Sequence, residues 1–254
     1  MLSKSILKQS IKNNWKLWAI LTGILCFFIT VTTFAAMSGG DMGPPRAEGG
    51  RGVNVMNMYE AMFFGMMGIM MLLIYAIAAG NKLVASEVDK GTMSFTLNTP
   101  TTRKQIIFSK VLFYITSIVL MAVLMGLFGT VASLITGTEI DYGTLWMMVF
   151  GFILFGLATS SICFAASCWF NKGGQSLLIG AGLPVGFYLL NAFSGLLTIN
   201  GNEFLKYFSI NTLFDTAAIA TGSGFIIQFI AMGVIAIALY FVGIRKFLRK
   251  DLPL

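Results

Sequence analysis

Residue types able to do chemistry are scarce in this sequence. An enzyme working at a membrane interface needs a nucleophile or an acid–base pair, and the only candidates are Glu139 with Asp141 and Glu203 with Asp215. Both pairs fall in polar segments between apolar runs, where we expect them to solvate external turns. The sequence contains no histidine, so the commonest general base and metal ligand is missing. We therefore predict neither a catalytic nor a metal site in this chain.

A nucleotide site is not expected either. The phosphate-binding loop of a P-loop NTPase requires a Gly-Lys dipeptide, and the sequence has none. If ATP drives this protein, another chain must bind the ATP and its Mg²⁺, so we predict no cofactor here. Cys26, Cys163 and Cys168 all fall inside apolar runs, where cysteine is expected to pack as a small residue rather than to form a disulfide or hold a metal.

The composition predicts an integral membrane protein. The chain is 57% hydrophobic and 11% charged, with a mean hydropathy of +0.84, whereas a soluble domain carries about twice that charged fraction. A spanning helix needs about 20 apolar residues, so 254 residues leave room for six spans in a single transmembrane domain. We expect an all-α bundle with spans at residues 18–37, 60–80, 111–135, 145–169, 177–197 and 225–244.

The segments between the spans differ in character. Residues 38–59 are rich in glycine and proline, which favours a flexible external loop. Residues 198–224 are too short and too interrupted to cross a bilayer, and we expect a short re-entrant or interfacial element at the outer face. The first span follows a basic segment and could also be a cleaved signal peptide, but its apolar run is long, so we expect a retained helix.

Residues 1–17 carry lysines at a four-residue spacing. Lys4, Lys8, Lys12 and Lys16 would form one stripe of a helix, with Leu7, Ile11, Trp15 and Trp18 beside it. This pattern predicts an amphipathic elbow helix that lies on the membrane surface with its lysines toward the headgroups. The alternative is a plain basic flank to the first span.

The distribution of basic residues predicts the orientation. Six spans place both termini on one side, and fourteen of the seventeen lysines and arginines fall on that side. Only Arg46, Arg51 and Lys206 fall on the other. Basic residues favour the cytoplasmic side, so we expect a multi-pass protein with both termini and residues 81–110 in the cytoplasm. The net charge of +7 is thus explained without a nucleic-acid partner.

The predicted spans hold almost no ionisable side chain. Glu60 lies at the outer edge of the second span and Lys110 at the inner edge of the third. Ion-coupled transporters place acids or histidines at mid-bilayer depth, so their absence argues against an ion-driven mechanism. We expect the energy to enter from the cytoplasm through residues 81–110.

The loop at 81–110 has a readable local pattern. Ser86 could cap a short helix whose first turn carries Glu87 and Asp89. Pro100 would then interrupt the chain. Thr101 or Thr102 could cap the next helix.

The same loop resembles the segment after the second transmembrane helix of ABC-2-type permeases, the membrane subunits of ATP-driven exporters. The matching residues are Glu87, Gly91, Thr92, Leu97, Pro100, Thr101 or Thr102, Arg103 and Lys110. This resemblance implies a bacterial plasma-membrane protein with a cytoplasmic coupling helix that docks on a separate ABC ATPase subunit, and a second permease chain, identical or paired. The residues implied in coupling are Glu87, Asp89, Lys90, Gly91, Thr92, Met93, Phe95, Leu97, Pro100, Arg103 and Lys104.

The second span is rich in methionine, and Met62, Met66 and Met70 repeat every four residues beside Phe63. Methionine suits surfaces that accept varied apolar partners, so this face is a candidate cargo contact; ordinary lipid-facing or helix-packing use is the alternative. In its short length, its glycine-rich first loop and its second span rich in methionine and phenylalanine, the chain resembles permeases that export amphipathic peptides. Drug, lipid or ion cargo fits the coupling loop equally well, and an ion-coupled transporter or a non-transporting assembly subunit are more distant alternatives.

Overall fold

The computed structural model of the protein describes residues 3–37, 55–93, 101–138, 140–196, 210–222 and 224–250. Several predicted features lie outside these ranges. They are the external loop up to residue 54, the candidate coupling residues Phe95, Leu97 and Pro100, the acids Glu139 and Glu203, and residues 197–209 of the external element.

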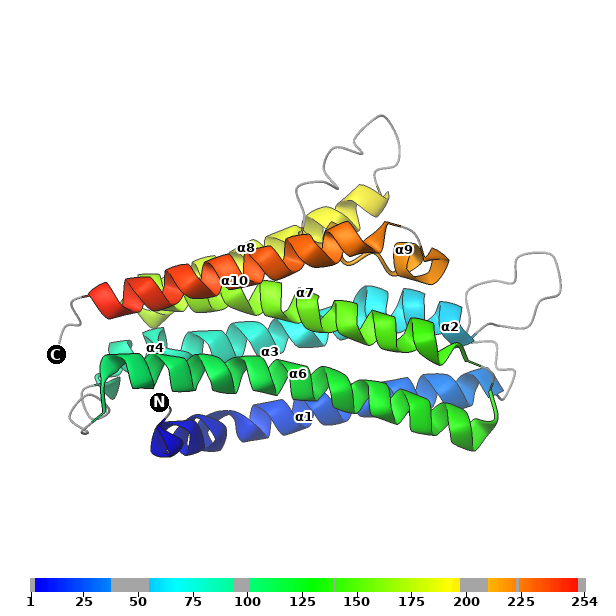
Figure 1. Ribbon diagram of the computed structural model, residues 1–254, viewed down its shortest axis with the longest axis horizontal. Coiled ribbons are helices and arrows are strands. Elements are labelled where there is room, and N and C mark those ends of the chain that lie inside the picture. Colours follow the sequence, from blue (N-terminus) through cyan, green and yellow to red (C-terminus); the bar gives the residue numbers. More distant parts are fainter. Residues whose placement is uncertain are drawn as a thin grey trace.

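Six long helices lie side by side, and the described residues contain no strand (Figure 1). The helices are α1 (Lys4–Met37), α3 (Gly68–Leu83), α6 (Arg103–Thr136), α7 (Tyr142–Trp169), α8 (Gly173–Leu196) and α10 (Phe225–Arg249). Six helical segments are long and apolar enough to cross a membrane, the second of them beginning at Phe63 in the π-helix η1 (Tyr59–Met67) and continuing through α3. The prediction of an all-α bundle with six spans is confirmed.

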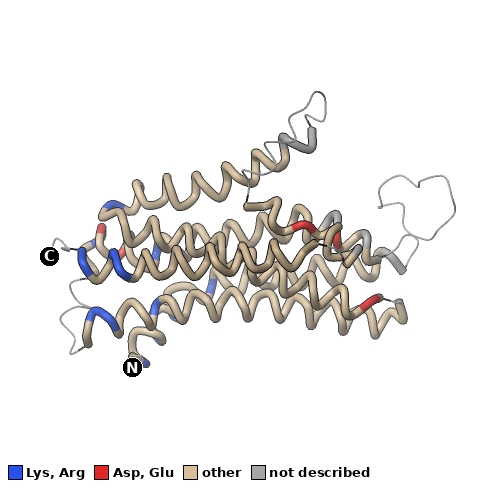
Figure 2. Tube along the Cα trace, turned by 45° about the horizontal axis from the view of Figure 1, so that its top comes forward, with Lys and Arg blue, Asp and Glu red and all other residues tan. Residues whose placement is uncertain are grey.

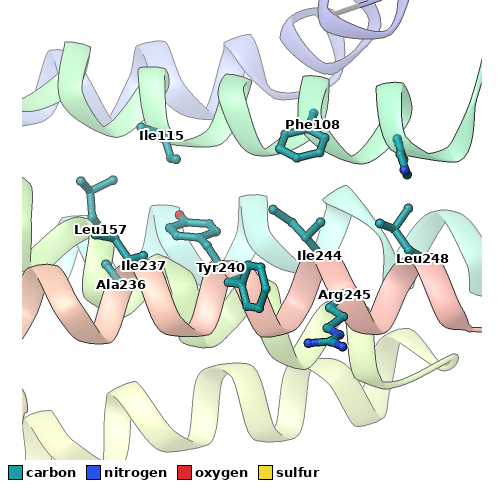
Figure 3. Close-up of a pocket in the computed structure, with 11 residues that line it drawn as sticks. Phe108, Ile115, Leu157, Ala236, Ile237, Tyr240, Ile244, Arg245 and Leu248 are labelled. Carbon is teal, nitrogen blue, oxygen red and sulfur yellow. The ribbon is translucent and has the colours of Figure 1, made fainter. Parts of the chain in front are cut away.

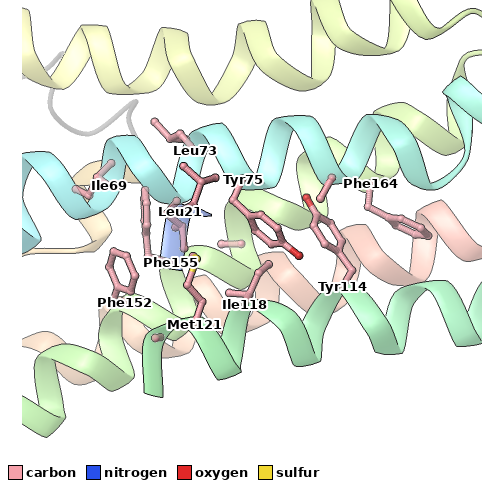
Figure 4. Packing of buried hydrophobic residues seen from close by; sticks show 14 of the residues in the cluster. Leu21, Ile69, Leu73, Tyr75, Tyr114, Ile118, Met121, Phe152, Phe155 and Phe164 are labelled. Atoms are coloured by element: carbon pink, nitrogen blue, oxygen red, sulfur yellow. The ribbon is translucent and has the colours of Figure 1, made fainter. Parts of the chain in front are cut away.

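Helix α7 forms the centre of the bundle. It packs against α3, α6, α8 and α10, and no residue from 151 to 168 is exposed. Its aromatic side chains Phe152, Phe155 and Phe164 belong to the same buried cluster as Tyr75 of α3 and Tyr114 of α6 (Figure 4). By contrast, α8 and α10 are the least buried of the six spans and form part of the outer surface.

Several helices are longer than the apolar runs that predict them. Helix α6 begins at Arg103 rather than near Val111, and α3 continues to Leu83. The start of α6 is fixed by a capping box, in which the Thr102 hydroxyl accepts from the Gln105 amide and the Gln105 side chain accepts from the Thr102 amide. At 1.5 Å per residue, α6 is about 50 Å long, against about 30 Å for the hydrocarbon core of a bilayer. The surplus carries the chain into the polar region.

The predicted elbow and the first span form one helix, α1, without an interruption at residue 17. The first turns of α1 are viewed nearly end-on in Figure 1, while the rest runs along the bundle, so the helix changes direction. Lys4, Lys8, Lys12 and Lys16 are exposed, as is Trp15. The buried side of these turns is made by Ile6, Ser10 and Asn14, and the amide of Ser3 donates to Ser109 Oγ at 3.0 Å. Placement of this segment at the membrane interface stays a prediction.

Short elements gather at the opposite end of the bundle from the chain termini (Figure 1). They are α2 (Val55–Met58), the π-helix η1, the 3-10 helix η3 (Ile210–Leu213) and α9 (Thr216–Thr221). Phe214, beside η3, stacks on Phe155 of α7 with ring centroids 5.8 Å apart. The described part of the predicted external element is therefore anchored to the central helix.

The described lysines and arginines gather toward the end of the bundle where the two termini lie (Figure 2). We call this the basic end. It contains the last turns of α3 and α10 and the first turns of α6 and α8.

Candidate functional site

The candidate site is a junction at the basic end built around α4 (Ala85–Asp89), a helix of five residues. It follows α3 after a break at Val84, whose φ of −131° and ψ of −63° are not helical. Ser86 lies inside α4, so the prediction that Ser86 caps this helix is wrong. The free amide of Ala85 is instead satisfied from another span, because it donates to Ser167 Oγ of α7 at 2.9 Å.

A buried ion pair joins α4 to α6. Lys110 has only 2% of its side chain exposed, and its ammonium lies 2.5 Å from Glu87 Oε2. The same Nζ donates to the carbonyl of Leu83 at the end of α3. A buried charge requires such partners, because leaving it unpaired costs several kcal/mol. Lys110 therefore holds the α3–α4 connection against α6.

A second link joins α4 to α8. Asp89 Oδ2 accepts from the amide of Gly173, the first residue of α8, at 3.2 Å. A carboxylate at a helix N-terminus is favourable because it satisfies a free amide and complements the helix dipole. The approach is close: a Cβ at position 173 would lie 3.3 Å from Asp89 Oδ2 and 3.7 Å from Ser86 Cα. Glycine fits here without displacing Asp89.

The far end of α4 faces outward. Lys90, Gly91 and Thr92 are exposed, and Gly91 has a φ of +68°, which glycine adopts without strain. The Thr92 hydroxyl donates to the Glu87 carbonyl at 3.2 Å, so the turn folds back on the helix. Met93 differs from these neighbours because it is 2% exposed and belongs to the hydrophobic core.

A third set of contacts at the basic end involves the end of α10. Lys250 Nζ donates to the carbonyls of Cys168, Trp169 and Phe170 at 3.0, 3.0 and 2.9 Å, which are the free carbonyls at the end of α7. Partial burial lowers the pKa of Lys250. Lys246 lies 4.6 Å above the ring of Trp169, and Arg103 Nη1 donates to the Lys250 carbonyl at 3.3 Å.

Glu87, Asp89, Lys110 and Arg103 were expected from the sequence to matter, but the contacts that tie this junction to distant helices were not: Ala85 with Ser167, Asp89 with Gly173, and Arg103 with Lys250. Ser167, Gly173 and Lys250 lie between 80 and 150 residues away from the groups that they bind. A lysine just after the last helix is a recognised cap for helix carbonyls, but nothing in the sequence shows that the helix in question is α7. Lys104, which follows Arg103 in the first turn of α6, is exposed.

The structure divides the candidate cargo residues. Met66 and Met70 are exposed, at 60% and 43%. Phe63 is buried and packs edge-on against Phe64 with centroids 5.5 Å apart, so its side chain is not on the surface of this chain. The side chain of Met62 lies outside what the structure describes. An α-helix would place Phe63 on the same face as Met66, three residues later, but η1 is π-helical and its wider turn changes the angle between these two side chains.

The acids proposed as solvating groups act as helix caps where they are described. Asp141 Oδ1 accepts from the Gly143 amide at 2.9 Å and Oδ2 accepts from the Thr144 hydroxyl at 2.6 Å. These hydrogen bonds lower the pKa of Asp141. Asp215 Oδ1 accepts from the amides of Ala217 and Ala218 at the start of α9. Within the described ranges, no three His, Cys, Asp or Glu residues are grouped so that they could hold a metal ion.

The sequence of this chain matches a known protein family. The sequence model of the family described as ABC-2 family transporter protein matches residues 5–252, which is nearly the whole chain. A search of curated proteins found none that matches this chain.

Proposed function

Because this chain belongs to the ABC-2 family of transporter proteins, we propose that it is the permease subunit of an ATP-driven exporter whose motor is a separate ATPase. The family is a membrane component of ABC transporters, and the six apolar helices agree with that role. The permease itself is non-catalytic in this proposal. ATP and Mg²⁺ are bound by the partner subunit.

The observation that carries the proposal is the position of α4. One short helix is tied to α7 through Ser167, to α6 through Lys110 and to α8 through Gly173. A displacement of α4 is therefore passed to three spans at once. A helix with these connections and an exposed tip is suited to receive a force from a subunit at the basic end.

We assign the contact surface for the ATPase to the exposed tip at Lys90, Gly91 and Thr92, together with the exposed residues Asp89, Arg103 and Lys104. Phe95, Leu97 and Pro100 belong to the same proposed surface. Two of the predicted coupling residues take a different part. Glu87 and Met93 face this chain's own core, so we assign them to transmitting the displacement rather than to contacting the ATPase.

The test is copurification of ATP hydrolysis with the tagged chain from its native membrane. We expect Lys90→Glu at the tip to lower the copurifying ATPase activity at least twofold, because the tip would meet its partner with reversed charge. Lys82→Glu, an exposed lysine near the end of α3, is the matched control and should retain the activity. Full activity with Lys90→Glu would remove the tip from the contact.

The proposed exporter needs a second permease chain, identical or homologous, because six spans supply half of a pathway. The outer face of α8 supports an interface of this kind: Gly182 and Gly186 have no atom within 4 Å of an added Cβ, and small residues permit helices to approach closely. We place both termini and α4 on the cytoplasmic side of a bacterial plasma membrane, in accordance with the basic end.

For the cargo we propose an amphipathic peptide, as in the phenol-soluble modulin exporters that the chain resembles in size and texture. The exposed Met66 and Met70 support an apolar, adaptable contact surface. Transport of a labelled amphipathic helical peptide into inverted vesicles, dependent on ATP, tests this. Drug, lipid or ion export would be favoured if the peptide failed to move while ATP hydrolysis responded to one of those cargoes.

A further inference from the structure

An open groove between α6 and α10 lies on the outside of the bundle (Figure 3). It has a volume of about 630 Å³. Its walls come from Phe108 and Ile115 of α6 and from Ile237, Tyr240 and Ile244 of α10, with Leu157 of α7 at its base. The hydroxyl of Tyr240 is paired with Ser160 at 2.7 Å, so the wall offers an apolar surface. A single apolar tail fits this description.

The two cationic residues of the groove lie toward its basic end. Lys104 lines it from the first turn of α6, and Arg245 lines it from the last part of α10. Among the described residues that line it, none is acidic. The first turn of α6 also presents the positive end of a helix dipole, which adds to the attraction for an anion. The groove is therefore apolar along most of its length and cationic at one end.

The length of the groove matches one leaflet. The lining residues of α6 run from Lys104 to Ile115 and those of α10 from Ala236 to Leu248, which at 1.5 Å per residue is about 17 Å. Half of the hydrocarbon core is about 15 Å. An occupant with a tail of that depth and an anionic head at the level of Lys104 and Arg245 is a phospholipid of the leaflet on the basic side.

We propose that this groove is a specific binding site for one anionic phospholipid, with its phosphate at Lys104 and Arg245 and an acyl chain along α10. Basic pockets between transmembrane helices bind anionic headgroups through this combination of charge and apolar surface. The bound lipid would link the start of α6 to the end of α10. These two helices share few direct contacts compared with those each makes to α1 or α7, so the lipid fills a place where the protein itself packs sparsely.

Native mass spectrometry of the full chain in detergent tests the proposal with two probes of equal acyl length, phosphatidylglycerol and phosphatidylcholine. We expect one phosphatidylglycerol per chain to be retained at a concentration where phosphatidylcholine is lost. The double variant Lys104→Gln/Arg245→Gln should retain at least tenfold less phosphatidylglycerol. The control Lys82→Gln/Lys172→Gln removes the same charge from exposed lysines outside the groove and should bind as the wild type does.

A second measurement locates the lipid. Phe241→Trp places a tryptophan fluorophore in the groove, and Ile20→Trp places one at an exposed position of α1. For each variant, the fluorescence of the parent chain, which has its own tryptophans, is subtracted before quenching is compared. Brominated phosphatidylglycerol should quench the first more than brominated phosphatidylcholine does, and both lipids should quench the second equally.

Four results would overturn the site. Equal retention of the two lipids, or equal loss in the control variant, would mean annular lipid only. Displacement of the phosphatidylglycerol by an equimolar amphipathic peptide would assign the groove to cargo. A Phe241→Trp signal that neither lipid quenches, in a chain that dimerises, would assign it to a second copy.

Discussion

Lys110 and Glu87 form an asymmetric pair, because the lysine side chain is 2% exposed and the carboxylate is 20% exposed. Removing the carboxylate leaves a buried ammonium with only the Leu83 carbonyl, whereas removing the lysine leaves a carboxylate that water can reach. Breaking a buried pair from its more exposed side should therefore cost more than breaking it from the buried side.

Glu87→Met, which removes the acceptor as well as the charge, should thus lower the free energy of unfolding by about 3–5 kcal/mol, and Lys110→Met by clearly less. The double variant should recover much of the loss, because no unpaired charge remains. Thermal unfolding in detergent measures all three. Equal destabilisation by the two single changes would mean that the ammonium is not buried as the structure has it.

Asp141 gives a pH dependence with a defined sign. Its folded-state pKa lies below the ordinary value of 3.8 because the Thr144 hydroxyl and the Gly143 and Thr144 amides donate to the carboxylate. A depressed pKa contributes stability that is present above the unfolded pKa and is lost as the pH falls through the folded pKa. The penalty of Asp141→Ala, measured as a difference in Tm from the wild type, should be constant from pH 7 to 5 and shrink below pH 3.8. A penalty unchanged at pH 3 would contradict this.

At the scale of the helix, close packing depends on glycines at particular crossings. A Cβ at Gly80 of α3 would lie 2.8 Å from Cys163 Cβ of α7 and 2.8 Å from the Tyr114 hydroxyl of α6. A Cβ at Gly233 of α10 would meet nothing within 4 Å. Small residues at such crossings let membrane helices approach one another closely.

Gly80→Ala should therefore destabilise the bundle by about 1–3 kcal/mol, the usual cost of overpacking. Gly233→Ala, the matched control, should be neutral or slightly stabilising because alanine is the better helix former. The two variants are compared by thermal unfolding in the same detergent. A stable Gly80→Ala would show that α3 and α7 are farther apart than the structure places them.

The sequence predicts elements that depend on interactions between residues close together in the chain, and it does not predict those that depend on distant residues. The six spans depend on apolar runs, and the start of α6 depends on Thr102 and Gln105, which are three residues apart; both are local. The junction at α4 depends on Glu87 meeting Lys110 and on Asp89 meeting Gly173, across 23 and 84 residues. Such pairs need the tertiary fold, which is also why Ser86 could be mistaken for a cap. The π-helical turn that buries Phe63 has no signature in the methionine spacing.

At the scale of the whole molecule, the orientation is open to a direct test. The three native cysteines are buried, so single cysteines introduced at the surface can be labelled against a low background. Thr92→Cys at the basic end should react with an impermeant maleimide only in inverted vesicles. Thr138→Cys, at the other end of α6, is the matched control and should react only in right-side-out vesicles. The reverse pattern would place α4 outside the cell and remove the ATPase from the proposal.

No residue of α7 from 151 to 168 is exposed, although Leu157 borders the open groove between α6 and α10. A span that faces lipid needs an apolar side along its length. A span covered almost entirely by neighbouring helices does not, and it can carry hydroxyl groups on several sides. Ser160, Ser161 and Ser167 use this freedom, for each is paired inside the protein. The buried serines of this helix are therefore shielded from hydrocarbon by the surrounding protein, and a charge or a bulky label should be tolerated on the neighbouring helices long before it is tolerated here.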